Sequence, residues 1–88
     1  MRYEVRLAPL ARPQLNTLSE TVAAAVLNFL DGPLAENPHR VGKALLNPLD
    51  GLHSARRGSD RVLYRIEDEP VVVTVIKIDH RRDVYRPS

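Results

Sequence analysis

The sequence predicts an α+β domain in which a two-helix hairpin packs on an antiparallel, twisted sheet. A short segment of alternating apolar and charged residues opens the chain, leucines and valines at helical spacing follow, and two β-rich segments come last. Helices that precede a run of strands favour an antiparallel sheet over a parallel one. The expected order of elements is β-α-α-β-β-β, with one more short strand expected at residues 83–86.

The first strand and the first helix follow from local patterns. Residues 3–7 alternate between apolar and charged side chains, which is the period of a strand with one buried face. Leucines at helical spacing come next. Because proline disrupts the interior of a helix but fits its first turn, we expect this helix to begin near Ala11 or Arg12, with Pro13 in the first turn.

The second helix has a start signal, an apolar face and a stop signal. Thr17 and Glu20 have the spacing of a capping box, and Ser19 alone is an equally good N-cap. Gly32 followed by Pro33 predicts the end of the helix. The face that we expect to pack on the sheet consists of Val22, Val26, Phe29 and Leu30.

A connection over residues 33–50 leads to the two β-rich segments. Its prolines and glycines indicate turns, with room for a short helical turn around residues 34–36. Arg40 and Lys43 flank Gly42, and their plainest interpretation is as solvated loop charges. After the connection, residues 61–66 alternate as a strand does, and residues 71–78 form the β-branched run of a strand covered on both faces.

Length and composition restrict the classes of protein. The 88 residues predict a single domain over residues 1–88. There is no cysteine, which excludes a disulfide framework and a thiolate metal site. No apolar stretch approaches the roughly 20 residues of a membrane span, and the N-terminus lacks the apolar core of a secretory signal. We therefore expect a cytoplasmic protein without a membrane partner.

The net charge of +2 says little about binding partners, but the distribution of the charged residues along the chain is more informative. Basic residues gather in or beside the β-rich segments, at Arg56, Arg57, Arg61, Arg65, Lys77, Arg81, Arg82 and Arg86. Because a strand turns alternate side chains to one face, such a sheet can hold several guanidinium groups in fixed positions and bind a polyanion. Rows of arginines on strands are also common as solvated faces or as surfaces for a protein partner.

Motifs of other chemistries are missing from the sequence. It has no phosphate-binding glycine-rich loop and no HExxH motif. His39, His53 and His80 lack the spacing of metal ligands, so we expect surface or hydrogen-bonding histidines and neither a metal nor a cofactor. The residues by themselves indicate a small α+β domain that binds an acidic partner.

Three stretches together resemble a known family. GLHSARRGSDRVLYRI, KIDHRRDVYR and the upstream RVGKALLNPLDGLH are similar to the RelE/ParE superfamily of bacterial toxins, in particular its RelE branch, over nearly the whole chain. The resemblance implies a RelE-like fold and a toxin of a type II toxin–antitoxin system. It implies a cognate antitoxin as partner, with a hetero-tetramer as a form of the complex, and cleavage of mRNA in the ribosomal A site by attack of a 2′-hydroxyl, without a metal.

The resemblance also implies roles for individual residues. Arg61 and Arg81 match arginines that contact the phosphate. Tyr85 matches the tyrosine proposed as acid or base, and Arg56 falls at another recurrent basic position. Arginine suits these positions because its planar fork binds two phosphate oxygens and stays charged. Arg82 is expected to help bind the RNA phosphates and to stabilise a phenolate at Tyr85.

The sequence departs from the family at two positions. Leu52 and Ser54 stand where well-studied members carry lysines. Arg57 and Lys43 are the expected substitutes in phosphate binding. His80 is the alternative proton-transfer group, because its ordinary pKa of about 6.5 allows it to give and take a proton.

Two other functions remain open. A ParE-like inhibitor would act by contact with DNA gyrase, although such relatives generally lack the arginine–arginine–tyrosine set. A degenerate toxin would only bind its antitoxin.

Overall fold

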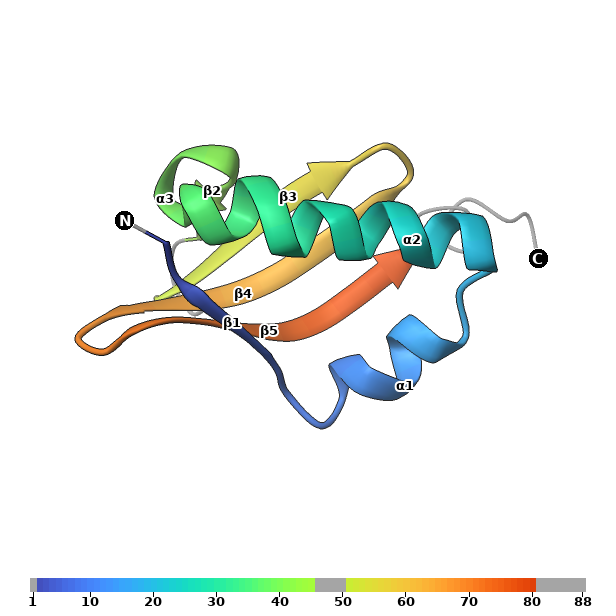
Figure 1. Ribbon diagram of the computed structural model, residues 1–88, viewed down its shortest axis with the longest axis horizontal. Coiled ribbons are helices and arrows are strands. Elements are labelled where there is room, and N and C mark those ends of the chain that lie inside the picture. The colour runs from blue at the N-terminus through green and yellow to red at the C-terminus, as the bar shows by residue number, and fades with distance from the viewer. Residues whose placement is uncertain (1, 46–50, 81–88) are drawn as a thin grey trace.

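Figure 1 shows an α+β fold in which helices lie against one face of a twisted sheet. The computed structural model describes residues 2–45 and 51–80, and the predicted fold class is confirmed for this part of the chain. The elements are β1 (Glu4–Leu7), α1 (Ala11–Asn16), α2 (Glu20–Phe29), the π-helical η1 (Leu30–Leu34), α3 (Pro38–Val41), β2 (Lys43–Ala44), β3 (Leu52–Arg57), β4 (Asp60–Asp68) and β5 (Val71–His80). No helix in the described ranges is long and apolar enough to cross a membrane. The predicted strand at residues 83–86 lies outside these ranges.

The five strands have the order β1-β5-β4-β3-β2. β2, β3, β4 and β5 pair antiparallel with their neighbours, as predicted, whereas β1 pairs with β5 in parallel, from Glu4 opposite Val72 to Leu7 opposite Val75. The sheet is therefore mixed, and the expectation of a purely antiparallel sheet does not hold at this edge. The alternation of side chains that predicts a strand carries no information on its direction, which here depends on the long connection through the helices and the other strands between β1 and β5.

The start signals of both helices are confirmed. α1 begins at Ala11, with Pro13 as its third residue. The Ser19 hydroxyl caps α2 by accepting a hydrogen bond from the backbone N–H of Val22 at 3.3 Å. The Thr17 hydroxyl instead donates to the Gln14 carbonyl at 2.8 Å, so Ser19 rather than Thr17 is the N-cap.

The predicted end of the second helix is wrong. The chain stays helical through Gly32 and Pro33 because residues 30–34 adopt wide π-helical turns, and residues 35 and 36 return to α-helix. Glycine and proline inside an α-helix cost about 1 and 3 kcal/mol. A π-helical segment changes the pairing of the backbone, so the hydrogen bond that proline cannot make is not required in its usual place. Leu34, the last residue of this segment, is fully buried, which offsets part of the remaining cost.

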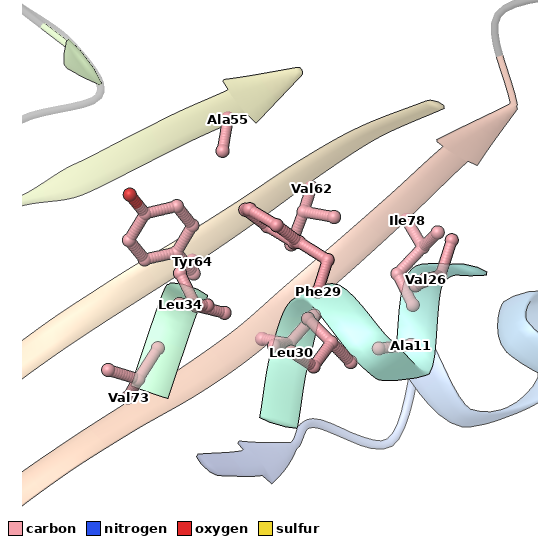
Figure 2. Close-up of a cluster of buried hydrophobic side chains, with 11 residues drawn as sticks. Ala11, Val26, Phe29, Leu30, Leu34, Ala55, Val62, Tyr64, Val73 and Ile78 are labelled. Carbon is pink, nitrogen blue, oxygen red and sulfur yellow. The ribbon is translucent and has the colours of Figure 1, made fainter. Parts of the chain in front are cut away.

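The core lies between α2, with η1, and one face of the sheet (Figure 2). The predicted helix face is confirmed, since Val26, Phe29 and Leu30 are buried and Val22 is partly buried. Tyr64 is the largest fully buried side chain in the described ranges, and its hydroxyl donates to the Pro38 carbonyl at 2.6 Å. The sheet contributes Ala55, Val62, Tyr64, Val73, Val75 and Ile78 to this core.

The connection after η1 contains more regular structure than predicted. The helical turn expected near residues 34–36 is present, and α3 and the two-residue strand β2 follow it. Lys43 pairs with Ser54 of β3, so it is an exposed residue of the sheet and not a loop charge. Gly42 is required before β2, because a Cβ atom there would meet the Tyr64 hydroxyl and would lie 2.7 Å from the Ser54 carbonyl oxygen.

Candidate functional site

The face of the sheet opposite α2, called the open face below, carries most of the basic side chains that the structure describes. Side chains alternate along each strand, and the core residues fix which of them point toward α2. No helix of the described ranges covers the other side (Figure 1). The residues of the open face are Glu4, Arg6, Lys43, Leu52, Ser54, Arg56, Arg61, Leu63, Arg65, Glu67, Val72, Thr74, Lys77 and Asp79.

Two predicted phosphate ligands are neighbours on the open face. Arg56 of β3 and Arg61 of β4 stand directly opposite each other, next to the last pair of the ladder. Both are exposed. The hairpin between them turns through Gly58 and Ser59, and Gly58 has the positive φ of 61° that such tight turns need. A short turn thus fixes the register that places the two guanidinium groups side by side.

A second row of the open face lies one step further along the strands. Lys43 of β2 stands beside Ser54 of β3, which faces Leu63 of β4, which faces Lys77 of β5. Lys43 therefore reaches the position at which the family resemblance expects a lysine and the sequence has Ser54. Lys43 lies beside Ser54 and Arg57 does not, while the role of either as the substitute cation stays a prediction.

Ion pairs neutralise only part of the open face. Arg6 contacts Glu4 at 2.5 Å, which holds the pKa of the Glu4 carboxyl below its usual value, and Lys77 contacts Asp79 at 3.6 Å. Within residues 2–45 and 51–80, no ion pair involves Lys43, Arg56, Arg61 or Arg65. The cations near the β3–β4 turn are therefore available to an anion, and Glu4 and Glu67 lie toward the opposite end of the face. The other acidic residue of this face, Asp79, lies opposite Arg61 and contacts Lys77.

The remaining predicted site residues lie on the other face of the sheet or have side chains outside the described part of the chain. Arg57 is the last residue of β3 and alternates to the opposite face from Arg56. His80 ends β5, with its backbone opposite Asp60, and its side chain is outside the description. Arg81, Arg82 and Tyr85 lie outside the described residues, so their roles stay predictions.

Sequence reasoning missed Lys77 as a member of this site. By simple alternation Lys77 would share the core face with Val71, Val73 and Val75, but a β-bulge reverses the alternation before it. A lysine at a core-facing position inside an apolar run was the signal, because a buried unpaired ammonium is too costly to be stable. The sequence alone therefore held a sign of the bulge.

Aromatic and acidic side chains form a second cluster under α3, on the helix side of the sheet. The His53 ring stacks on Tyr64 with centroids 5.6 Å apart, and the His39 ring meets His53 edge-on at 5.8 Å. His39 Nε2 lies 3.2 Å from the Asp68 carboxylate, which also accepts a hydrogen bond from the Tyr3 hydroxyl at 2.6 Å. The expectation of a surface, hydrogen-bonding histidine is confirmed for His39.

His53 differs from His39 in its surroundings. Its Nδ1 atom is buried and has no hydrogen-bond partner among the described residues. Burial, and second the neighbouring His39, lower the pKa of His53, because both disfavour the charged imidazolium. In the described part of the chain no group of histidines and carboxylates could hold a metal ion. This cluster therefore serves packing, while the open face carries the candidate site.

Comparison with known families identifies the class of protein. The profile of the ParE toxin of the type II toxin–antitoxin system parDE matches residues 5–85. The chain belongs to this family. The resemblance to RelE/ParE toxins that the sequence motifs indicated is confirmed.

Two curated relatives and one crystal structure place the toxin near the RelE members. It is 48% identical to Toxin RelG of Mycobacterium tuberculosis over 86 residues, 98% of this chain and 99% of the relative. It is 49% identical to Toxin RelE of the same organism over 84 residues, 96% of this chain and 87% of the relative. The toxin–antitoxin complex RelBE2 of M. tuberculosis contains a chain with a TM-score of 0.90 and 46% identity, covering 92% of this toxin and 93% of that chain.

Proposed function

We propose that this toxin is an endoribonuclease that cuts mRNA in the ribosomal A site in the cytoplasm. The observation that carries the proposal is the pair of exposed arginines, Arg56 and Arg61, held opposite each other on the open face without an ion pair in the described residues. Two like charges placed together on a sheet destabilise it, so their position favours a role in binding an anion. Similarity to relatives named RelG and RelE supports an RNA phosphate as that anion.

The proposed reaction needs no cofactor and balances as an internal transfer. The 2′-oxygen of a nucleotide attacks the adjacent phosphorus, and the bond from phosphorus to the 5′-oxygen breaks. The products are a 2′,3′-cyclic phosphate and a 5′-hydroxyl. A base removes the proton of the 2′-hydroxyl, an acid protonates the leaving 5′-oxygen, and cations stabilise the charge on the non-bridging oxygens.

The residues receive roles in this proposal as follows. Arg61 and Arg81 hold the oxygens of the scissile phosphate, and Tyr85 is the proton-transfer group, with His80 as the alternative. Tyrosine has an ordinary pKa of about 10, so nearby cations have to lower it for Tyr85 to act as a base. Phosphates of neighbouring nucleotides are bound by Arg56, Arg57, Lys43 and Arg82.

A cognate antitoxin is the second proposed partner. The family is defined by toxin–antitoxin systems, and the RelBE2 structure is a complex of both proteins. The basic open face suits an antitoxin segment that carries acidic side chains. One proposed form of the complex is a hetero-tetramer of toxin and antitoxin. An antitoxin on this face would exclude RNA from the same cations.

The test is cleavage of mRNA on programmed ribosomes, mapped by primer extension, with and without the antitoxin. We expect the wild type to cut in the A site and the antitoxin to abolish cutting. Arg61→Ala should lower the rate on the order of 10²–10³-fold, the loss typical of one transition-state donor. Arg40→Ala is the matched control, because Arg40 is an exposed arginine of α3, outside the open face.

The same assay separates the other assignments. Tyr85→Phe removes only a hydroxyl and should slow cleavage by about tenfold or more if Tyr85 transfers the proton. Normal cleavage by Tyr85→Phe together with an inactive His80→Ala would transfer that role to His80. A wild type that spares mRNA but blocks supercoiling by DNA gyrase would be a ParE-like inhibitor, and one that only binds antitoxin would be a degenerate toxin.

A further inference from the structure

A β-bulge on β5 brings two charged side chains to the open face. Leu63 pairs with Lys77 and Tyr64 pairs with Val75, so Ile76 is an extra residue without a partner on β4. Before the bulge, odd-numbered residues such as Val73 and Val75 point into the core. After it, Ile78 takes the core position and Lys77 moves to the open face.

The bulge places Lys77 beside the arginine pair. Asp79 stands directly opposite Arg61, which makes Lys77 a diagonal neighbour of Arg61. Diagonal neighbours on one face of a sheet lie about 7–8 Å apart, within reach of long side chains. Arg61 and Lys77 can therefore both contact one short segment of a bound RNA chain.

The contact between Lys77 and Asp79 does not explain this arrangement through stability. Lys77 Nζ lies 3.6 Å from the Asp79 carboxylate, with side chains 45% and 43% exposed. An ion pair at this level of exposure contributes at most about 1 kcal/mol, and often nothing measurable. This weak pair leaves the ammonium group of Lys77 exposed and able to exchange Asp79 for another anion.

We propose that Lys77 is a further RNA contact of this toxin, which binds the phosphate next to the one that Arg61 holds. This proposal rests on the ribonuclease function proposed above. Successive rows of the open face are two residues apart, or about 7 Å along a strand, which is close to the step between phosphates of an extended chain. Asp79 holds Nζ beside Arg61 until RNA replaces it. Lysine suits this role as a point charge on a flexible stem.

The test measures single-turnover cleavage on programmed ribosomes at increasing toxin concentration. Lys77→Met keeps the apolar stem and removes the charge. We expect it to raise the half-saturating toxin concentration on the order of 10-fold or more, as for loss of a hydrogen bond to a charged group, with little change in the rate at saturation. Lys77→Arg should restore most of the affinity, and Arg40→Met is the control for loss of a cation elsewhere.

A double variant distinguishes RNA binding from simple neutralisation of Asp79. If Lys77 only cancels the negative charge of Asp79, the double variant Lys77→Met with Asp79→Asn recovers wild-type cleavage, and the proposal is overturned. If Lys77 contacts RNA, the double variant stays weaker than Asp79→Asn alone. Wild-type cleavage by Lys77→Met, while Arg61→Ala is inactive, also overturns this proposal but leaves the ribonuclease function intact. A wild type that never cuts mRNA refutes the ribonuclease function instead.

Discussion

Replacing Arg56 with glutamate is expected to stabilise the protein while it weakens cleavage. Arg56 and Arg61 stand opposite each other, and the Cβ atoms of such pairs lie about 5 Å apart. Two like charges about 5 Å apart in water repel by about 0.8 kcal/mol, and salt at about 0.1 M lowers this to about 0.5 kcal/mol. The long guanidinium stems can move apart, so this repulsion is an upper limit.

Glutamate at position 56 turns the repulsion into an attraction of similar size. The free energy of unfolding should therefore rise by at most about 1 kcal/mol, which agrees with the range of about 0.2–1 kcal/mol for cross-strand pairs. For a domain of this length the melting temperature rises by about 4–8 °C per kcal/mol. Cleavage should fall on the order of 10-fold or more, because one charge-assisted contact to a phosphate is lost.

Thermal unfolding followed by circular dichroism measures the first effect, at low salt and at about 1 M salt, where the Debye length shrinks to about 3 Å. The rise in melting temperature of Arg56→Glu over the wild type should be present at low salt and largely vanish at high salt. Arg65→Glu is the control, because Arg65 of β4 faces Leu52 and has no arginine opposite it. If Arg56→Glu lowers the melting temperature, or if the rise in melting temperature is the same at low and high salt, Arg56 contributes to the stability of the fold. The proposed repulsion between Arg56 and Arg61 is then refuted.

Two further predictions concern the region that supports the open face. Gly42→Ala should lower the free energy of unfolding by about 1–3 kcal/mol, because its methyl group overlaps the Tyr64 hydroxyl and the Ser54 carbonyl. Gly32→Ala, with open space around its Cβ, should instead be neutral or stabilising, and equal losses in denaturant titrations of both variants would contradict the packing argument. Burial lowers the pKa of His53, so the unfolded chain binds a proton at His53 more readily than the folded chain does. The free energy of unfolding should therefore fall as the pH drops below about 6.5. His53→Phe keeps the ring stack and should reduce this loss between about pH 7.5 and pH 5.5; an unchanged loss would assign it to other groups.

Local patterns predicted the elements well, because each pattern has a local physical cause. Alternation marked β1 and β4, an unbroken β-branched run marked β5, and Ser19 marked the start of α2. The end of α2 was missed because the cost of Gly32 and Pro33 is local, whereas burial of Leu34 in the core is a tertiary gain. The parallel pairing of β1 was missed because strand direction leaves no trace in the alternation.

The candidate site was predicted from the family resemblance, and the sequence could not show how its residues lie in space. Arg56 and Arg61 were assigned one by one from the family resemblance, and the tight turn at Gly58 is what places them opposite each other. Lys43 was assigned to a loop because a two-residue strand has too few residues to show a period. Its position beside Ser54 depends on a pairing between segments that the sequence does not connect locally.

β5 is the strand in which the requirements of the core and of the site meet. Strict alternation from Val75 onward would turn Lys77 and Asp79 toward α2 and Ile78 toward solvent, and both changes oppose folding. One inserted residue, Ile76, corrects both at once: Ile78 enters the core at 3% exposure, and the two charged side chains join Arg61. The inserted residue costs local pairing in the ladder, but burial of an isoleucine side chain is worth about 1.5–3 kcal/mol. Packing alone therefore explains why a bulge exists, and the RNA contact proposed for Lys77 would explain why the residue that the bulge turns to the open face is a lysine.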